Sequence, residues 1–174
     1  AHEEAAAITA TRHPILKYVS WQESPEWMIP KAWWLSKHEP EVFAAADLIA
    51  DETDWLMHKL TGRWTASQCN VTCKWNYARP EGGWPTGLLE VLGLSQLQEK
   101  WPQEVLPMGA LAGELTSQAA VELGLRPGIP VAQGGIDAYA AMLGVAVVKP
   151  GRMALVMGTS TCHMALCDHG IFES

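Results

Sequence analysis

Apolar and polar residues follow one another along most of the chain in short blocks whose spacing is typical of amphipathic helices. In one such block Trp55, Leu56 and Leu60 fall on one side of a helix, and Gly62 stands where a helix commonly ends. Proline, serine or threonine at the start and glycine at the end mark several of the other blocks. These signals predict helices at residues 1–10, 32–37, 40–46, 55–60, 86–92, 95–100, 117–123 and 138–143.

Strands are expected where short apolar runs lack helical spacing. The run 47–50 is one of them, and the runs 131–133 and 153–157 read as buried strands that each lead into a glycine-rich turn. A further strand is expected at residues 162–166. Strands and helices arranged around glycine turns predict an α/β architecture. The turn residues 149–151 mark the one expected domain boundary.

Composition and charge are those of a soluble globular protein. Of 174 residues, 48% are hydrophobic and 18% are charged, and the mean hydropathy is +0.00. The net charge of −7 argues against nucleic-acid binding, which usually needs a basic face. An anionic ligand would need a metal ion and local amide dipoles to offset that charge. No apolar run approaches the roughly twenty residues that cross a bilayer, and no secretion signal is found.

Two groups of side chains resemble metal sites, and neither is expected to be one. The four cysteines form two pairs whose spacings fit no common zinc pattern, so reduced and mostly buried thiols are expected. The carboxylates of Asp51, Glu52 and Asp54 precede a predicted helix, where they complement its dipole as a capping cluster. No metal-ligating residue is therefore predicted from the protein itself.

The first glycine-rich turn, Gly134 to Asp137, offers a candidate catalytic base. Glycines allow backbone amides to approach a ligand closely, and Asp137 stands at the start of a predicted helix, whose positive end favours the charged carboxylate. An ionised carboxylate there can accept a proton from a substrate hydroxyl. The alternative is that Asp137 is only an N-cap.

The second glycine-rich turn offers a candidate phosphate site. Gly158, Thr159, Ser160 and Thr161 supply backbone amides and three hydroxyls within four residues. The turn is not a Walker A loop, because no Gly-Lys-Ser/Thr follows it, and by itself it is equally a polar β-turn. A carboxylate turn followed by a hydroxyl-rich turn suggests a base beside a phosphoryl donor.

Several motifs in order resemble the FGGY family of carbohydrate kinases, within the actin-like superfamily of ATPases. The centre of the resemblance is GGIDAYAAMLG followed by MALVMGTSTCHM. Upstream, Lys31, Trp34 and Leu35 match the family's first signature, whereas Glu26 and Met28 depart from its strict form in the manner of ribulokinase-like members. The segments DWL…LTG and CNVTCKW, which begin at residues 54 and 69, are similar to later family motifs.

The resemblance implies an actin-like, RNase H-like α/β fold and an incomplete portion of a kinase. Residues 1–150 would be the later part of the first domain, which binds sugar, and residues 151–174 the beginning of the second. The family's N-terminal phosphate loop and its adenosine pocket are expected to lie outside this chain. The intact protein is expected to be a cytoplasmic homodimer that does not associate with a membrane.

The implied reaction transfers the γ-phosphoryl group of ATP to a hydroxyl of L- or D-ribulose, with Mg²⁺ on the phosphates. Asp137 would be the base, and Glu26, Lys74 and Asp137 would bind the sugar. Gly158, Thr159 and Ser160 would hold phosphate oxygens.

Alternatives stay open for the residues and for the whole chain. Glu26 is equally an exposed loop carboxylate, and Lys74 taken alone is a surface lysine. The intact protein is alternatively a xylulokinase-like kinase, a relative that binds a sugar or nucleotide without transfer, or an interaction piece whose exposed tryptophans cover a partner chain.

Overall fold

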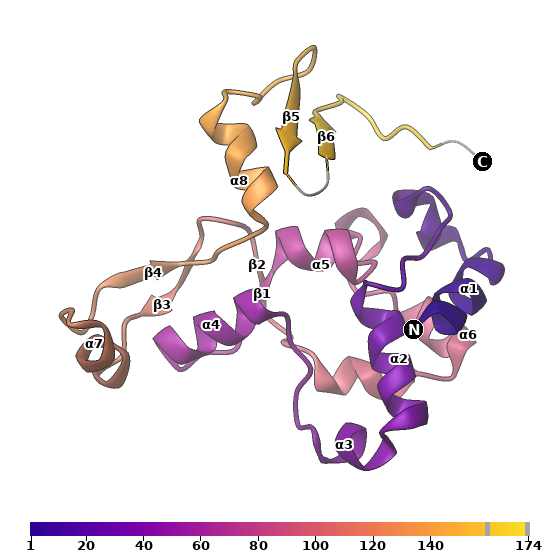
Figure 1. Cartoon of the computed structure of the whole chain (residues 1–174), viewed down its shortest axis with the longest axis horizontal. Coiled ribbons are helices and arrows are strands. Elements are labelled where there is room, and N and C mark those ends of the chain that lie inside the picture. The colour runs from indigo at the N-terminus through magenta and orange to yellow at the C-terminus, as the bar shows by residue number, and fades with distance from the viewer. Residues whose placement is uncertain (159–160, 173–174) are drawn as a thin grey trace.

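The computed structural model describes residues 1–158 and 161–172, and Figure 1 shows the course of the chain. Short helices dominate, and they are joined by turns and two-stranded sheets. The α-helices are α1 (His2–Ala10), α2 (Met28–His38), α3 (Pro40–Ala45), α4 (Glu52–Thr61), α5 (Gln68–Lys74), α6 (Thr86–Leu92), α7 (Ser117–Leu123) and α8 (Asp137–Gly144). The 3₁₀-helices are η1 (Pro14–Val19), η2 (Arg79–Glu81) and η3 (Ser95–Lys100).

The strands pair two by two in the part of the chain that the structure describes. They are β1 (Ala66–Ser67), β2 (Val105–Leu106), β3 (Leu111–Glu114), β4 (Pro130–Ala132), β5 (Met153–Met157) and β6 (Thr161–Ala165). β1 lies parallel to β2, whereas β3 with β4 and β5 with β6 are antiparallel. In Figure 1, α1, α2, α5 and α6 gather into one body, and β3, β4 and α7 extend away from it.

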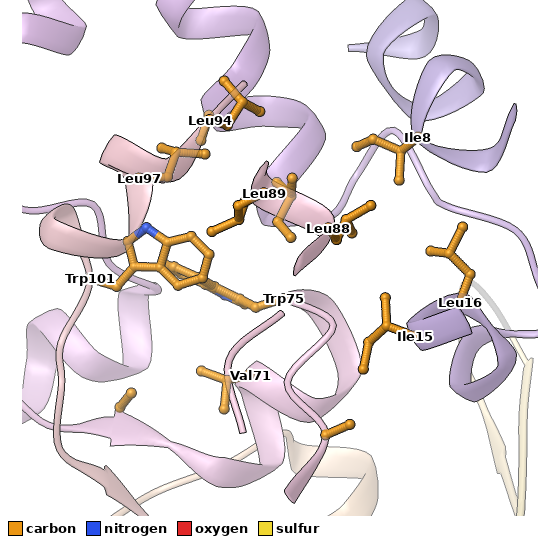
Figure 2. Close-up of a cluster of buried hydrophobic side chains, with 14 of the residues drawn as sticks. Ile8, Ile15, Leu16, Val71, Trp75, Leu88, Leu89, Leu94, Leu97 and Trp101 are labelled. Carbon is orange, nitrogen blue, oxygen red and sulfur yellow. The ribbon is translucent and has the colours of Figure 1, made fainter. Parts of the chain in front are cut away.

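The main core lies inside that helical body (Figure 2). Trp75, at the end of α5, packs edge-on against Trp101, with 5.1 Å between ring centroids. On α6, Leu88 and Leu89 are fully buried, whereas Val91 is 64% exposed. This helix therefore turns one face to the core, as its apolar spacing requires. The apolar contacts hold α5 firmly beside the N-terminal segments.

Glycine and threonine set the ends of several helices as the sequence predicts. Gly62, Gly93 and Gly124 follow α4, α6 and α7 with φ of 73°, 68° and 68°, a backbone region in which glycine carries no steric penalty. Thr116 caps α7, and its Oγ1 accepts the N–H of Ala119 at 3.2 Å. These predicted helices are confirmed. They could be predicted because their boundaries depend on residues close in the sequence.

Predictions that depended on burial or on regular pairing were partly wrong. Residues 47–50 form no strand, although the N–H of Ile49 donates to the carbonyl of Lys100 at 2.7 Å. The predicted helix 95–100 is the 3₁₀-helix η3, and α5 was not predicted. The ends of β4 and most of β5 are exposed rather than buried, as are Cys162 and Cys167.

A buried polar pair links the segment before α2 to the end of α5. Asn76, with φ of 54°, donates from its Nδ2 to Oε2 of Glu23 at 2.7 Å. The N–H of Glu23 donates to Oγ1 of Thr9 at 2.9 Å. Burial raises the pKa of Glu23 to about 7, against the opposing effect of the Asn76 hydrogen bond. The pair fixes the turn that follows Lys74.

We expect Leu89→Ala to destabilise the intact protein by about 2–5 kcal/mol, because it removes buried apolar contacts and leaves a cavity. Val91→Ala on the same helix is the matched control, and it should change the free energy of unfolding by less than about 0.5 kcal/mol. Urea unfolding followed by tryptophan fluorescence measures both. Equal destabilisation by the two variants would contradict the assigned inner face of α6.

The raised pKa of Glu23 predicts a pH dependence of stability. The ordinary pKa is 4.5 and the folded pKa about 7, so the folded protein binds this proton more tightly. The free energy of unfolding should therefore fall as the pH rises between these values. Glu23→Gln should remove this part of the slope, at most about 3 kcal/mol over the interval. Urea titrations at several pH values test it, with the exposed Glu99→Gln expected to keep the wild-type slope.

Candidate functional site

A cavity of about 490 Å³ lies between the first glycine-rich turn and the N-terminal end of α4, with α5 on its third side. It brings together residues from three separate parts of the sequence. Both polar and apolar side chains line it. They are Asp51, Glu52, Thr53, Leu56, Met57, Asn70, Lys74, Gly134, Gly135, Ile136 and Asp137.

Asp137 is the first residue of α8, and its side chain is exposed at the cavity. Its Oδ1 accepts the N–H of Ala138 at 2.7 Å, one of the free donors at the helix start. Ile136, and not Asp137, occupies the N-cap position of α8, so the alternative that Asp137 is the N-cap is wrong. The carboxyl group therefore lies at the positive end of the α8 dipole.

Lys74 lines the same cavity from the last turn of α5 and is half-buried. An ammonium group at this place offers up to three donors to a polar ligand. The structure thus brings Lys74 and Asp137 together, although they lie far apart in the sequence. Glu26, in contrast, is exposed just before α2 and is not among the lining residues.

The candidate phosphate turn begins directly after β5. Gly158 is exposed there, whereas Thr159 and Ser160 lie outside the residues that the structure describes. The β5–β6 hairpin packs against α8 through a small core of Met142, Val147, Ala154 and Met164. The hairpin that carries Gly158 is therefore anchored to the helix that begins with Asp137.

Ser67 ties the cavity walls together. Its N–H donates to Oδ1 of the buried Asp54 at 2.8 Å, and its hydroxyl donates to the carbonyl of Gly134 at 2.7 Å. One residue at the start of α5 thereby links α4 to the glycine-rich turn. Asn70 adds a second link, because its Nδ2 donates to Oγ1 of Thr53 at 3.2 Å.

The approach to the glycine-rich turn is fixed by Gln133, which is buried. Oγ1 of Thr65 donates to Oε1 of Gln133 at 2.6 Å. The backbone carbonyl of Gln133 accepts a hydrogen bond from the N–H of Gly109 at 2.9 Å, and the N–H of Gln133 donates to the carbonyl of Ala110 at 2.7 Å. Hydrogen bonds therefore hold both the backbone and the side chain of Gln133 at the point where the chain enters the turn.

Gly135 is closely packed. A Cβ at this position would lie 2.9 Å from Sδ of Met108, so the Met108 side chain would have to shift, and 3.2 Å from Cβ of Cys69. The adjacent Gly134 is less crowded, since its Cβ would meet Cγ2 of Thr53 at 3.4 Å. The turn therefore lies directly against α5, whereas the sequence pattern predicted the close approach of a ligand at these glycines.

Asp54 has a different role from the capping that the sequence suggested. Asp51 is the N-cap of α4, whereas Asp54 is fully buried and holds Ser67. Burial raises the pKa of Asp54 to about 7, and the nearby charge of Asp51 adds to the rise, while the Ser67 N–H opposes it. The roles of Ser67, Thr65 and Gln133 could not be predicted from the sequence, because each depends on a partner distant in the chain.

The described part of the chain holds no group of three or more His, Cys, Asp or Glu side chains placed to bind a metal ion. The carboxylates of Asp51, Glu52 and Asp137 on one cavity are hard oxygen donors, of the kind that Mg²⁺ binds through one or two carboxylates and several waters. Among the described residues, no helix has the length and apolar character of a membrane span.

Residues 14–144 match the family model for the N-terminal domain of the FGGY family of carbohydrate kinases. Over 146 residues the chain is 38% identical to a ribulokinase of Anoxybacillus flavithermus, covering 82% of this chain and 26% of that protein. It is 37% identical over 184 residues to a human FGGY carbohydrate kinase domain-containing protein, covering 95% of this chain and 33% of the relative.

Among solved structures, a xyloylose kinase from Brucella ovis aligns with a TM-score of 0.78 and 26% sequence identity. The alignment covers 94% of this chain and 33% of that structure. The chain thus spans between about a quarter and a third of the length of the relatives it matches. The fold is the α/β, actin-like fold of the sugar kinases, and the chain belongs to the FGGY family of carbohydrate kinases.

Proposed function

We propose that this chain carries the sugar-binding part of a kinase that transfers the γ-phosphoryl group of ATP to a terminal hydroxyl of ribulose, either the L or the D isomer. The observation that carries the proposal is the shared cavity of Asp137 and Lys74. Family membership supports phosphoryl transfer to a sugar, and similarity to proteins described as ribulokinases supports the choice of ribulose.

Asp137 accepts the proton of the attacking hydroxyl. Its carboxylate stands at the positive end of α8 and projects at the cavity surface, so a sugar oxygen can reach it from solvent. Loss of the hydroxyl proton makes the oxygen a better nucleophile toward the phosphorus atom. Lys74 donates hydrogen bonds to other sugar oxygens and so fixes which hydroxyl faces Asp137. Glu26 is proposed as a further sugar contact on the basis of the sequence motif alone.

The nucleotide phosphates bind at the turn after β5. Gly158, Thr159 and Ser160 supply amide and hydroxyl donors to phosphate oxygens. Mg²⁺ bound together with the nucleotide would supply positive charge beside the phosphate oxygens. The packing of α8 against the β5–β6 hairpin supports this arrangement, since it couples Gly158 to the helix of Asp137.

Domain organisation, location and assembly are part of the same proposal. The family match ends at residue 144, which supports a boundary between a first domain, 1–150, and the beginning of a second, 151–174. Four free cysteines agree with a reducing, cytoplasmic environment. A homodimer is proposed for the intact protein, and light scattering measures its oligomeric state.

We expect Asp137→Asn in the intact protein to lower kcat for sugar phosphorylation about a hundredfold or more, because the amide cannot accept the proton. The sugar KM should change little. Lys74→Met should instead raise the sugar KM about tenfold, because a hydrogen-bond donor to the sugar is lost. Steady-state kinetics measures both, with the exposed Asp47→Asn as control. Wild-type turnover in Asp137→Asn would remove this residue from the mechanism.

The substrate is tested with a panel of L-ribulose, D-ribulose, D-xylulose and glycerol, by coupled detection of ADP from the intact protein. Ribulose should give the highest kcat/KM. Preference for D-xylulose would establish the alternative of a xylulokinase-like enzyme, which the similarity to the Brucella ovis structure supports.

The same panel distinguishes non-catalytic alternatives. A sugar-dependent change in tryptophan fluorescence without ADP release would indicate a binding protein. Neither signal would indicate an interaction piece, to which the half-exposed Trp55 could contribute contact area.

A further inference from the structure

A second cavity, of about 560 Å³, lies next to the glycine-rich turn, and most of its lining is apolar. The proposed sugar cavity and this one are both lined by residues of α5 and α8. The polar exceptions include two thiols and a phenol, from Cys69, Cys73 and Tyr139. Nothing in the proposed phosphoryl transfer uses these three groups.

Cys69 and Cys73 lie one helical turn apart on α5, so their side chains share a face. Both are free and half-buried. Hydrogen bonding by the neighbouring Cys73 thiol, and to a lesser extent by the Ile136 N–H, lowers the pKa of Cys69 against the opposing effect of burial.

The pKa of Cys73 shifts in the opposite direction. Its hydrogen bond to Cys69 raises its pKa, as does burial, so it stays a thiol while Cys69 becomes the thiolate. Tyr139, on α8, lines the same cavity, and the neighbouring Cys73 raises the pKa of its phenol. The two thiols and the phenol therefore form one cluster in this cavity.

Cys69 also touches the backbone that presents Asp137. Ile136, which donates to the sulfur, is the N-cap of α8 and precedes Asp137 directly. A Cβ on the adjacent Gly135 would lie 3.4 Å from Sγ of Cys69, so little space remains on that side. The Cys69 side chain therefore packs against the turn on one side and faces the cavity on the other.

We propose that Cys69 is an oxidation site for hydroperoxides, with Cys73 as the resolving thiol, and that this oxidation switches off the adjoining sugar site. The inference rests on the proposed function for the identity of that site. The apolar lining of the cavity suits an organic hydroperoxide better than a charged oxidant. The two thiols lie one helical turn apart on α5, and they line one cavity with the phenol of Tyr139.

The oxidation takes place in two steps. The Cys69 thiolate attacks the outer oxygen of the hydroperoxide, the O–O bond breaks, and the alkoxide leaves with the proton of Cys73. Cys69 is now a sulfenic acid and Cys73 a thiolate. The Cys73 sulfur then attacks the Cys69 sulfur and expels hydroxide, which takes a proton to become water. Two thiols and one hydroperoxide give a disulfide, an alcohol and water.

The disulfide changes the sugar site in two ways. Residues four apart on a helix have Cβ atoms about 5–6 Å apart, whereas a disulfide needs about 3.5–4.5 Å. The last turn of α5 must therefore deform, and that turn carries Lys74. The Cys69 sulfur also ceases to be an anion, so the N–H of Ile136 loses its charged acceptor beside Asp137.

To test this proposal, the intact protein is treated with cumene hydroperoxide. Sugar phosphorylation and the masses of its peptides are then measured in the same samples. In the wild type, turnover should fall about tenfold or more while the peptide with both thiols loses two hydrogens. Dithiothreitol should restore both. In Cys73→Ser, dimedone should instead label Cys69 as a trapped sulfenic acid.

Cys69→Ser should resist the oxidant, and Cys167→Ser, which alters an exposed thiol outside this cavity, should behave as the wild type. Should Cys69→Ser fail to fold, the wild type and Cys73→Ser still decide the question.

The inference is overturned if Cys69 is oxidised no faster than Cys167, or if the disulfide forms and turnover is unchanged. The masses report thiol chemistry even if no sugar is phosphorylated. In that case the proposed function fails separately, and with it the claim that oxidation switches a kinase site.

Discussion

The double attachment of Ser67 is the constraint on which the proposed site depends. Its backbone N–H binds the carboxyl group of Asp54, and its hydroxyl binds the carbonyl of Gly134. A single residue thus fixes the distance between α4, α5 and the turn before α8. Both bonds are buried from water or nearly so, and the loss of either leaves a polar group without a partner. The cavity exists because these three elements cannot drift apart.

Close packing and electrostatics act together at this turn. Gly135 packs closely against Met108 and Cys69, so the turn lies beside the Cys69 sulfur. The same proximity therefore underlies both the proposed placement of Asp137 at a sugar and the proposed reactivity of Cys69. Proposed catalysis and proposed oxidation share one structural cause.

The sequence predicted what local chemistry determines. Helix ends at Gly62, Gly93 and Gly124, the cap at Thr116 and the helix start at Asp137 follow from residues within one turn of each feature. Pairings across the chain could not be predicted in this way. The bond of Ser67 to Asp54 joins two elements, and in the sequence Asp54 was indistinguishable from an ordinary capping carboxylate. Burial of β4 was mispredicted because apolar composition does not reveal which faces are covered.

The small core between α8 and the β5–β6 hairpin has a mechanical consequence. Met142, Val147, Ala154 and Met164 are buried only while helix and hairpin stay together, so a rotation at residues 149–151 would expose them. The glycines at 134–135 are held separately, by the bond of Ser67 to Gly134 and by the packing of Gly135 against Cys69. The residues 149–151 that the sequence marks as a boundary therefore do not separate two independently packed parts. Any movement that keeps this core intact would carry α8 and the hairpin together, and Asp137, the proposed base, would move with the proposed phosphate turn.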